Sequence, residues 1–157
     1  MSLSSPALAP IPGAPLKIGI VAASYNERLV GALVAQALAA LRRAGVREKN
    51  LFVIRVPGSM EIPIAAQMLL ARRRPDAVIA LGVIVRGDTI HYELIAEAVA
   101  HALQRVALDA RVPVINGVVV AENPAQAAAR CLGRIERGAE FARAALAMAA
   151  LKKKGRP

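Results

Sequence analysis

Residues 77–91 read AVIALGVIVRGDTIH, and this stretch decides the fold of the chain. Residues 77–85 are apolar, rich in β-branched side chains and without helical spacing, which predicts a strand buried on both faces. The run gives way to Gly87, and Asp88 or Thr89 is expected to cap a long helix that follows. A strand, a glycine turn and a capped helix start place free backbone N–H groups and the positive end of a helix dipole at the carboxyl edge of a sheet.

Such a turn favours the binding of an anion, most simply a phosphate. His91 falls in the first turn of the expected helix, where it could act on whatever carries that phosphate. Histidine ordinarily titrates near neutral pH, which suits it to proton transfer. An ordinary structural interpretation stands beside this one, because glycine and aspartate are common in loops and a histidine at a helix start is commonly just solvated.

Outward from this stretch, strand and helix alternate along the chain. The apolar patterns predict strands over 16–23, 51–56, 77–85 and 114–120 and helices over 27–44, 62–73, 90–110, 124–130 and 136–151. The connections are too short for separate domains, so residues 16–151 are expected to form one parallel sheet with helices on both faces. A flexible proline-rich arm (1–15) and a frayed basic tail (152–157) are expected at the two ends. On the helix over 90–110, the side chains expected to face inward are Leu94, Ile95, Ala98, Val99, Ala102 and Val106.

Composition limits the classes of protein that this chain can belong to. It has 157 residues, of which 56% are hydrophobic. No apolar run reaches the ~20 residues of a membrane span, and no secretory signal is expected. Cys131 is the single cysteine, which excludes an internal disulfide and favours a reducing compartment, so a cytoplasmic location is expected. Two histidines and one cysteine at these spacings do not make a metal site.

The formal net charge of +10 is compatible with a nucleic-acid surface. Many of the cations, however, lie in 42–43, 72–74 and the tail, where helices are expected to end and where cations are favoured. The chain has two tyrosines, two phenylalanines and no tryptophan, which is little for base stacking. An anionic substrate accounts for part of the charge equally well, so neither a nucleic acid nor a membrane is the expected partner.

Four loops leave the carboxyl ends of the expected strands, at 24–26, 57–61, 86–91 and 121–124. Ligands of open α/β sheets bind at this edge, and the unusual residues of the chain gather there. Most of them have two interpretations. Tyr25 either stacks on a flat ring or covers the sheet edge, and Asn26 either pairs with a ring amide or caps a helix.

Three further residues also have two interpretations. Glu61 either accepts hydrogen bonds from sugar hydroxyls or complements a helix dipole. Asn116, inside an apolar strand, is either satisfied by the protein or faces a ligand. Arg130 either clamps a phosphate or is a solvated helix end.

The pattern resembles the lumazine synthase family of riboflavin biosynthesis. The resemblance rests on Tyr25-Asn26, VPGSMEIP (56–63), ALGVIVRGDTIHY (80–92), PVINGV (113–118) and QAAAR (126–130). It covers about residues 17–151, with the order and spacing of the motifs kept.

The resemblance implies a flavodoxin-like three-layer α/β/α sandwich around a four-stranded parallel sheet. It implies that 5-amino-6-(D-ribitylamino)uracil condenses with 3,4-dihydroxy-2-butanone 4-phosphate. The products would be 6,7-dimethyl-8-ribityllumazine, phosphate and water, and no cofactor takes part. Family members form homo-pentamers or multiples of pentamers, and each active site lies between neighbouring subunits.

Roles follow residue by residue from the matching motifs. Tyr25 would stack on the pyrimidine ring beside Asn26, and His91 would be the proton shuttle. Asn116 and Arg130 would come from the adjacent subunit, with Arg130 closing on the phosphate. The residues expected to hold the ribityl chain and ring edge are Ser59, Met60 and Glu61. Those expected to line the ring pocket with backbone groups are Val83, Ile84 and Val85, and those expected to receive the phosphate are Gly87, Asp88 and Thr89.

The chain departs from the common family pattern at several of these positions. Asn116 stands where phenylalanine is common, Tyr25 replaces a phenylalanine, and Met60 replaces an aromatic residue. Asp88 places a carboxylate beside the expected phosphate, so its backbone N–H is expected to bind while its side chain turns away or caps the helix. These changes keep a second hypothesis open, in which a protein of the same fold retains a flavin or lumazine without turnover.

Overall fold

The computed structural model of the chain describes residues 10–155. The first nine residues of the expected arm and the last two of the expected tail lie outside them. The elements follow the predicted order: β1 (Ile18–Ala23), α1 (Glu27–Arg43), η1 (Glu48–Asn50), β2 (Leu51–Val56), η2 (Ser59–Glu61), α2 (Ile62–Arg73), β3 (Ala77–Val85), α3 (His91–Ala110), β4 (Val114–Ala121), α4 (Pro124–Leu132) and α5 (Arg137–Lys154). None of the helices within this part of the chain is long and apolar enough to cross a membrane.

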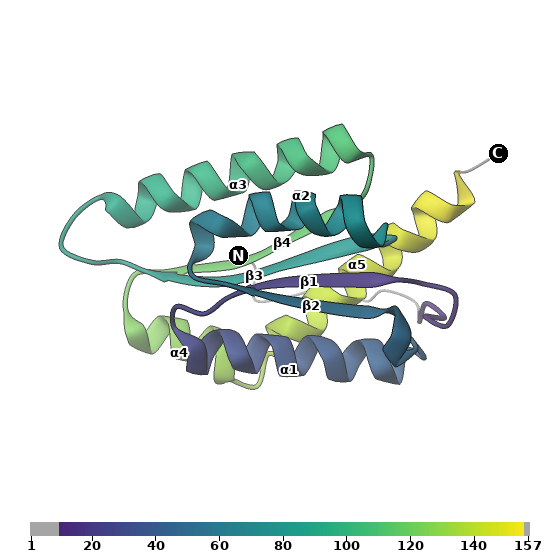
Figure 1. The fold of residues 1–157 in the computed structure, drawn as a ribbon. Coiled ribbons are helices and arrows are strands. Elements are labelled where there is room, and N and C mark those ends of the chain that lie inside the picture. Colours follow the sequence, from purple (N-terminus) through teal and green to yellow (C-terminus); the bar gives the residue numbers. More distant parts are fainter. Residues whose placement is uncertain (1–9, 156–157) are drawn as a thin grey trace.

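The four strands form one parallel sheet in the order β2-β1-β3-β4. Helices α2 and α3 cover one face of it, and α1, α4 and α5 cover the other (Figure 1). This is the predicted three-layer sandwich, and the strand order is that of a flavodoxin-like sheet, in which β1 and β3 meet at the topological switch point.

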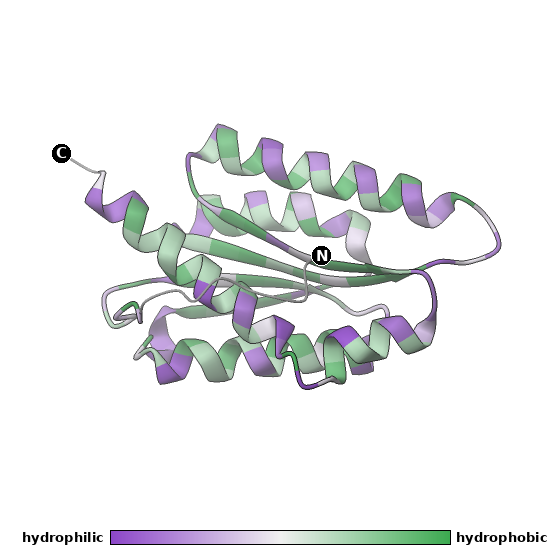
Figure 2. Ribbon diagram, turned by 180° about the vertical axis from the view of Figure 1, so that it is seen from behind, coloured by the Kyte–Doolittle hydropathy of each residue, from purple (hydrophilic) through white to green (hydrophobic). Residues whose placement is uncertain are grey.

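The two central strands carry the core. Every residue of β1 is buried, as are the first eight of β3, which confirms that residues 77–85 form a strand covered on both faces. Figure 2 shows the strands as a largely hydrophobic layer between helices in which hydrophilic and hydrophobic residues alternate. Leu33 of α1 and Ile79 of β3 belong to the core on one face, and Leu69 of α2 and Val78 of β3 belong to the core on the other.

Helix α5 lies directly against α1 at Gly138. A Cβ atom at this position would lie 2.1 Å from the backbone oxygen of Leu33, so only glycine permits the contact. The Gln36 side chain secures the same junction: its Oε1 accepts from the Gly138 N–H at 3.0 Å, and its Nε2 donates to the Cys131 carbonyl at 2.9 Å. One side chain of α1 therefore holds the start of α5 and the end of α4.

The structure corrects three expectations about helix ends and faces. Helix α3 begins at His91, so Ile90 occupies the N-cap position and neither Asp88 nor Thr89 does. The loop is longer than predicted, although the Thr89 hydroxyl still accepts from the His91 N–H at 3.4 Å. Leu94 is 56% exposed and Ala98 is exposed as well, although both were expected to face inward, because α3 is apolar on more than one side and its spacing does not single out the inner face.

The end of α5 is the third correction. The helix continues three residues beyond the predicted Leu151, to Lys154. Its extension is anchored by Lys153, whose Nζ donates to the Pro15 carbonyl at 2.7 Å and lies 3.4 Å from the carboxylate of Asp76. Asp76 in turn accepts from the Lys17 backbone N–H at 2.8 Å, which ties the end of α5 to the start of β1.

Candidate active site

Three of the four predicted loops enclose a cavity of about 550 Å³ beyond the carboxyl ends of β1, β2 and β3. The cavity lies at the switch point, where ligand sites of this architecture are found. Eleven predicted site residues line it: Tyr25, Asn26, Ser59, Met60, Glu61, Val83, Ile84, Val85, Gly87, Thr89 and His91. Three do not: Asp88, Asn116 and Arg130.

The loop after β1 is fixed from two sides. Its Ser24 and Tyr25 N–H groups donate to the carbonyls of Val56 (2.7 Å) and Pro57 (3.1 Å) at the end of β2. Asn26 adopts the left-handed conformation, with φ 56°, and its Nδ2 donates to the Val83 carbonyl at 2.9 Å. Asn26 thus occupies the N-cap position of α1 without a side-chain cap bond, and its amide connects β1 to β3. Tyr25 is 76% exposed and lines the cavity.

The loop after β2 forms the second wall. Glu61 Oε2 accepts from the Gly58 N–H at 2.9 Å, which closes the turn of η2. Ser59 is buried against Gly82 of β3, where a Cβ atom would lie 2.7 Å from Ser59 Oγ. The close approach of this loop to β3 therefore depends on the missing side chain at Gly82. Met60 is 50% exposed beside the cavity.

The loop between β3 and α3 has the features of an anion site. Residues 86–91 are all exposed. Within residues 10–155, the backbone N–H groups of Gly87, Asp88 and Thr89 have no hydrogen-bond acceptor. Nothing lies within 4 Å of the place where a Cβ of Gly87 would stand, so an anion can approach the backbone closely. The loop leads into the N-terminus of a 20-residue helix, whose dipole favours negative charge there.

His91 is the first residue of α3, and it is exposed and lines the cavity next to this loop. The second histidine, His101, is also exposed but lies in the middle of α3, away from the cavity, as expected from the sequence. The cavity therefore combines a flat aromatic ring, hydrogen-bonding groups, free amides for an anion and one histidine. This set of groups suits a ring-bearing molecule and a phosphate ester that exchange protons with His91.

Tyr92 and Ile95 line the cavity as well, although no role was predicted for either. Their position next to His91 and one turn after it on the same helix is the signal that could have found them. The Tyr92 hydroxyl donates to Glu93 Oε1 at 2.9 Å, and this hydrogen bond, together with burial, raises the pKa of Tyr92. The Arg86 guanidinium lies 5.8 Å from the Tyr92 ring centroid.

Residues 86–91 are called the anion loop below. Arg86 joins this loop to Glu122, which directly follows β4. Its Nη1 lies 3.0 Å from Glu122 Oε2, and this hydrogen bond raises the pKa of Arg86. Glu122 is held in turn, because its backbone N–H donates to Gln126 Oε1 at 2.7 Å in the first turn of α4. The fourth predicted loop therefore supports the site without lining it.

Asn116 and Arg130 lie elsewhere in the single chain. Asn116 is exposed on the edge strand β4, opposite Ala80 in the register, and its Oδ1 accepts from the Val118 N–H at 3.1 Å. Arg130 is half-buried in the last turn of α4. The chain does not bring either side chain to its own cavity.

Comparison with known proteins agrees with this geometry. The sequence model of the family described as 6,7-dimethyl-8-ribityllumazine synthase matches residues 15–153. The curated protein of that name from Acidovorax ebreus is 45% identical over 139 residues, 88% of each chain. Its counterpart from Thermococcus gammatolerans is 44% identical over 142 residues, which cover 90% of this chain and 91% of that one. The chain belongs to the 6,7-dimethyl-8-ribityllumazine synthase family.

Proposed function

We propose that the cavity between Tyr25 and His91 is the active site at which this chain joins 5-amino-6-(D-ribitylamino)uracil to 3,4-dihydroxy-2-butanone 4-phosphate. The observation that carries the assignment is the row of free N–H groups at Gly87, Asp88 and Thr89 beside His91. That row suits the phosphate of the butanone. Tyr25 suits the uracil ring, and Ser59 and Glu61 suit the ribityl hydroxyls.

Catalysis of this reaction requires mainly that the two substrates be held in the right positions. The uracil amine attacks the ketone to give a carbinolamine, which loses water to form an imine. Phosphate is then eliminated, and the second amine adds to the carbonyl formed by that elimination and loses a second water as the ring closes. Both substrates are reactive by themselves, so holding them in one cavity supplies much of the rate. His91 moves protons between the amine, the carbinolamine oxygen and the leaving phosphate. We assign Asp88 a backbone role, because its N–H group has no acceptor within residues 10–155.

The pocket is proposed to be completed by a second copy of the chain. Asn116 and Arg130 lie outside the cavity of their own chain, and Arg130 is the cation proposed to close on the phosphate. Large apolar side chains are exposed on the helices that flank the site, including Ile64 and Met68 of α2 and Leu94 of α3. Such surfaces favour association. We propose a homo-pentamer or a multiple of pentamers.

Light scattering of the purified chain tests this assembly. A molar mass of five chains, or a multiple of five, is expected. A monomer would contradict the shared site, because one chain cannot bring Arg130 to its own cavity.

A cytoplasmic location belongs to the same proposal. It is supported by the single cysteine, which is unpaired and buried. The substrates are small molecules, and no nucleic-acid or membrane partner is proposed.

The activity is tested by mixing the two substrates with the protein and following the absorbance of the lumazine. The expected result is catalysed product formation that saturates in both substrates. Tight binding of lumazine or flavin without product formation would instead support a binding protein of the same fold. That is the hypothesis that the departures at Met60, Asn116 and Asp88 keep open. Absence of both product and binding would overturn the assignment.

A further inference from the structure

Gln36 of α1 is a polar side chain that connects three helices on one face of the sheet. Its Nε2 donates to the Cys131 carbonyl at 2.9 Å in the last turn of α4, and its Oε1 accepts from the Gly138 N–H at 3.0 Å in the first turn of α5. The side chain is half-buried, and both ends of its amide are engaged. An apolar side chain of the same size would pack at this place but would not hold α4 by a hydrogen bond.

Helix α4 is short, and it is held at both ends. It spans nine residues, and at its start the Asn123 side chain accepts from the Gln126 N–H at 2.8 Å. At the other end, the last carbonyls of a helix have no partner within the helix. Gln36 supplies a donor for one of them, the carbonyl of Cys131. Figure 1 shows α4 beside α1 on the same face of the sheet, and this arrangement brings the two residues together.

Arg130 lies in the same last turn of α4, directly before Cys131. It is half-buried, and within residues 10–155 its guanidinium makes no hydrogen bond and no ion pair. A guanidinium in this state is available to an anion from outside its own chain. In the proposed function, that anion is the phosphate of the butanone bound in the adjacent copy.

We propose that Gln36 is a positioning residue of the reaction and acts through Arg130. By holding the Cys131 carbonyl, it fixes the last turn of α4 and thus the point from which Arg130 reaches the phosphate. An arginine that binds an anion through two parallel hydrogen bonds depends on its direction as well as on its charge, so a small displacement of this turn weakens the contact. The inference rests on the proposed function and adds Gln36 to the groups that perform it.

A double-mutant cycle between Gln36→Met and Arg130→Ala tests the proposal. Methionine is close to glutamine in size and makes neither hydrogen bond, so the packing between the helices is kept. Gln36→Met is expected to raise the KM for the butanone phosphate about fivefold with little change in kcat, because His91 and the anion loop are untouched. In the Arg130→Ala background the same change should leave this KM unaltered, since the contact that Gln36 positions is already lost.

Gln36→Ala is the second variant for the cycle. It removes the same two hydrogen bonds and introduces the residue that most favours a helix, so it is expected to fold. Its KM should rise as in Gln36→Met, and again only where Arg130 is present.

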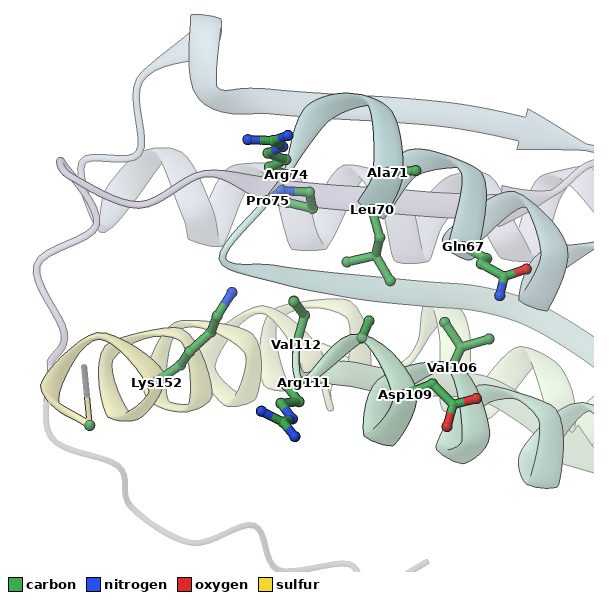
Figure 3. A pocket seen from close by; sticks show the side chains of 12 residues that line it. Gln67, Leu70, Ala71, Arg74, Pro75, Val106, Asp109, Arg111, Val112 and Lys152 are labelled. Carbon is green, nitrogen blue, oxygen red and sulfur yellow. The ribbon is translucent and has the colours of Figure 1, made fainter. Parts of the chain in front are cut away.

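The matched control is Gln67→Met on α2. Gln67 is exposed and lines a second cavity, of about 830 Å³, which is enclosed by the C-terminal halves of α2 and α3 and by the end of α5 (Figure 3). Pro75 and Val112, which come just before β3 and β4, also line it, so this cavity lies at the edge of the sheet opposite the proposed active site. Gln67→Met should leave KM and kcat unchanged, and light scattering should give every variant the molar mass of the unmodified chain.

An unchanged KM in Gln36→Met, or an equal rise in KM in the two backgrounds, would overturn the proposal. A loss of kcat together with a loss of assembly in both Gln36 variants would overturn it as well, because that pattern marks a purely structural side chain. A failure of the proposed function gives a different result. The unmodified chain would then form no lumazine, or Arg130→Ala would leave the KM for the butanone phosphate unchanged, and the basis of this inference would be removed too.

Discussion

Asn26 performs a task that neither interpretation of its sequence position anticipated. Its left-handed backbone turns the chain from β1 into α1, and its amide holds the Val83 carbonyl, so it fixes the Tyr25 loop against β3. Single side chains have similar effects elsewhere in the site. Glu61 closes its own turn and still faces the cavity, and His91 is placed by the start of α3.

His91 is the residue whose replacement separates proton transfer from binding. We expect His91→Ala to lower kcat by about 10²-fold with little change in KM for the butanone phosphate, because the anion loop remains intact. His101→Ala is the matched control, since that histidine is exposed on the same helix but lies outside the cavity. Steady-state kinetics on both variants gives the comparison, and full turnover by His91→Ala would show that the assigned role is wrong.

Cys131 predicts a dependence of stability on pH. Burial raises the pKa of its thiol to about 11 from an ordinary 9.0. The unfolded chain therefore loses this proton first as the pH rises. The stabilisation is complete below pH 9 and is lost as the pH rises through 11.

Urea unfolding across this pH range measures the effect. The free energy of unfolding should fall by up to about 2 to 3 kcal/mol more in the unmodified chain than in Cys131→Ala, which has no thiol to titrate. Parallel pH profiles for the two proteins would refute this account of Cys131.

At the scale of elements, the site depends on contacts that join one loop to the next. The anion loop is exposed along its whole length, and Arg86 connects it to Glu122 and to the face of Tyr92. Helix packing on the other side of the sheet depends on Gly138 and Gln36 in a comparable way.

We expect Arg86→Ala to loosen the anion loop. The Arg86–Glu122 pair is exposed, 58% and 56%, so its loss should change stability by less than about 1 kcal/mol. The KM for the butanone phosphate should nevertheless rise about fivefold, because the free amides are no longer held in place.

Two further variants serve as controls for this prediction. Arg105→Ala breaks another exposed ion pair, with Asp109 of α3, and should leave this KM unchanged. The charge swap Arg86→Glu/Glu122→Arg should restore most of the affinity. An unchanged KM in Arg86→Ala, or an equal rise in Arg105→Ala, would argue against the positioning role.

Gly138→Ala tests the contact between α1 and α5. The added methyl would meet the Leu33 backbone oxygen at 2.1 Å, and the helices would have to separate, so we expect a loss of about 1 to 3 kcal/mol in the free energy of unfolding. At Gly31 of α1 the nearest atom to such a methyl is 3.7 Å away, and Gly31→Ala should be neutral or stabilising by about 0.5 to 1 kcal/mol. Equal stabilities in chemical denaturation would contradict the close approach.

At the scale of the whole molecule, the sheet edge of the site could be predicted from sequence because strand and loop signals were strong there. The buried run at 77–85 and the turn at Gly87 identify both the central strand and the anion loop. The inner face of α3 could not be predicted, because the helix carries apolar side chains on more than one side, including the exposed Leu94. The second cavity also escaped prediction, because it is formed by ends of three helices that are distant in the sequence.

The carboxyl edge of the sheet carries the central claim, that the amides of residues 87–89 hold a phosphate next to His91. A crystal structure of the assembled protein soaked in inorganic phosphate tests this claim most directly. We predict a phosphate within hydrogen-bond distance of those N–H groups, with the His91 imidazole facing the same cavity. An empty loop, or an imidazole turned away from the cavity in the presence of saturating phosphate, would contradict it.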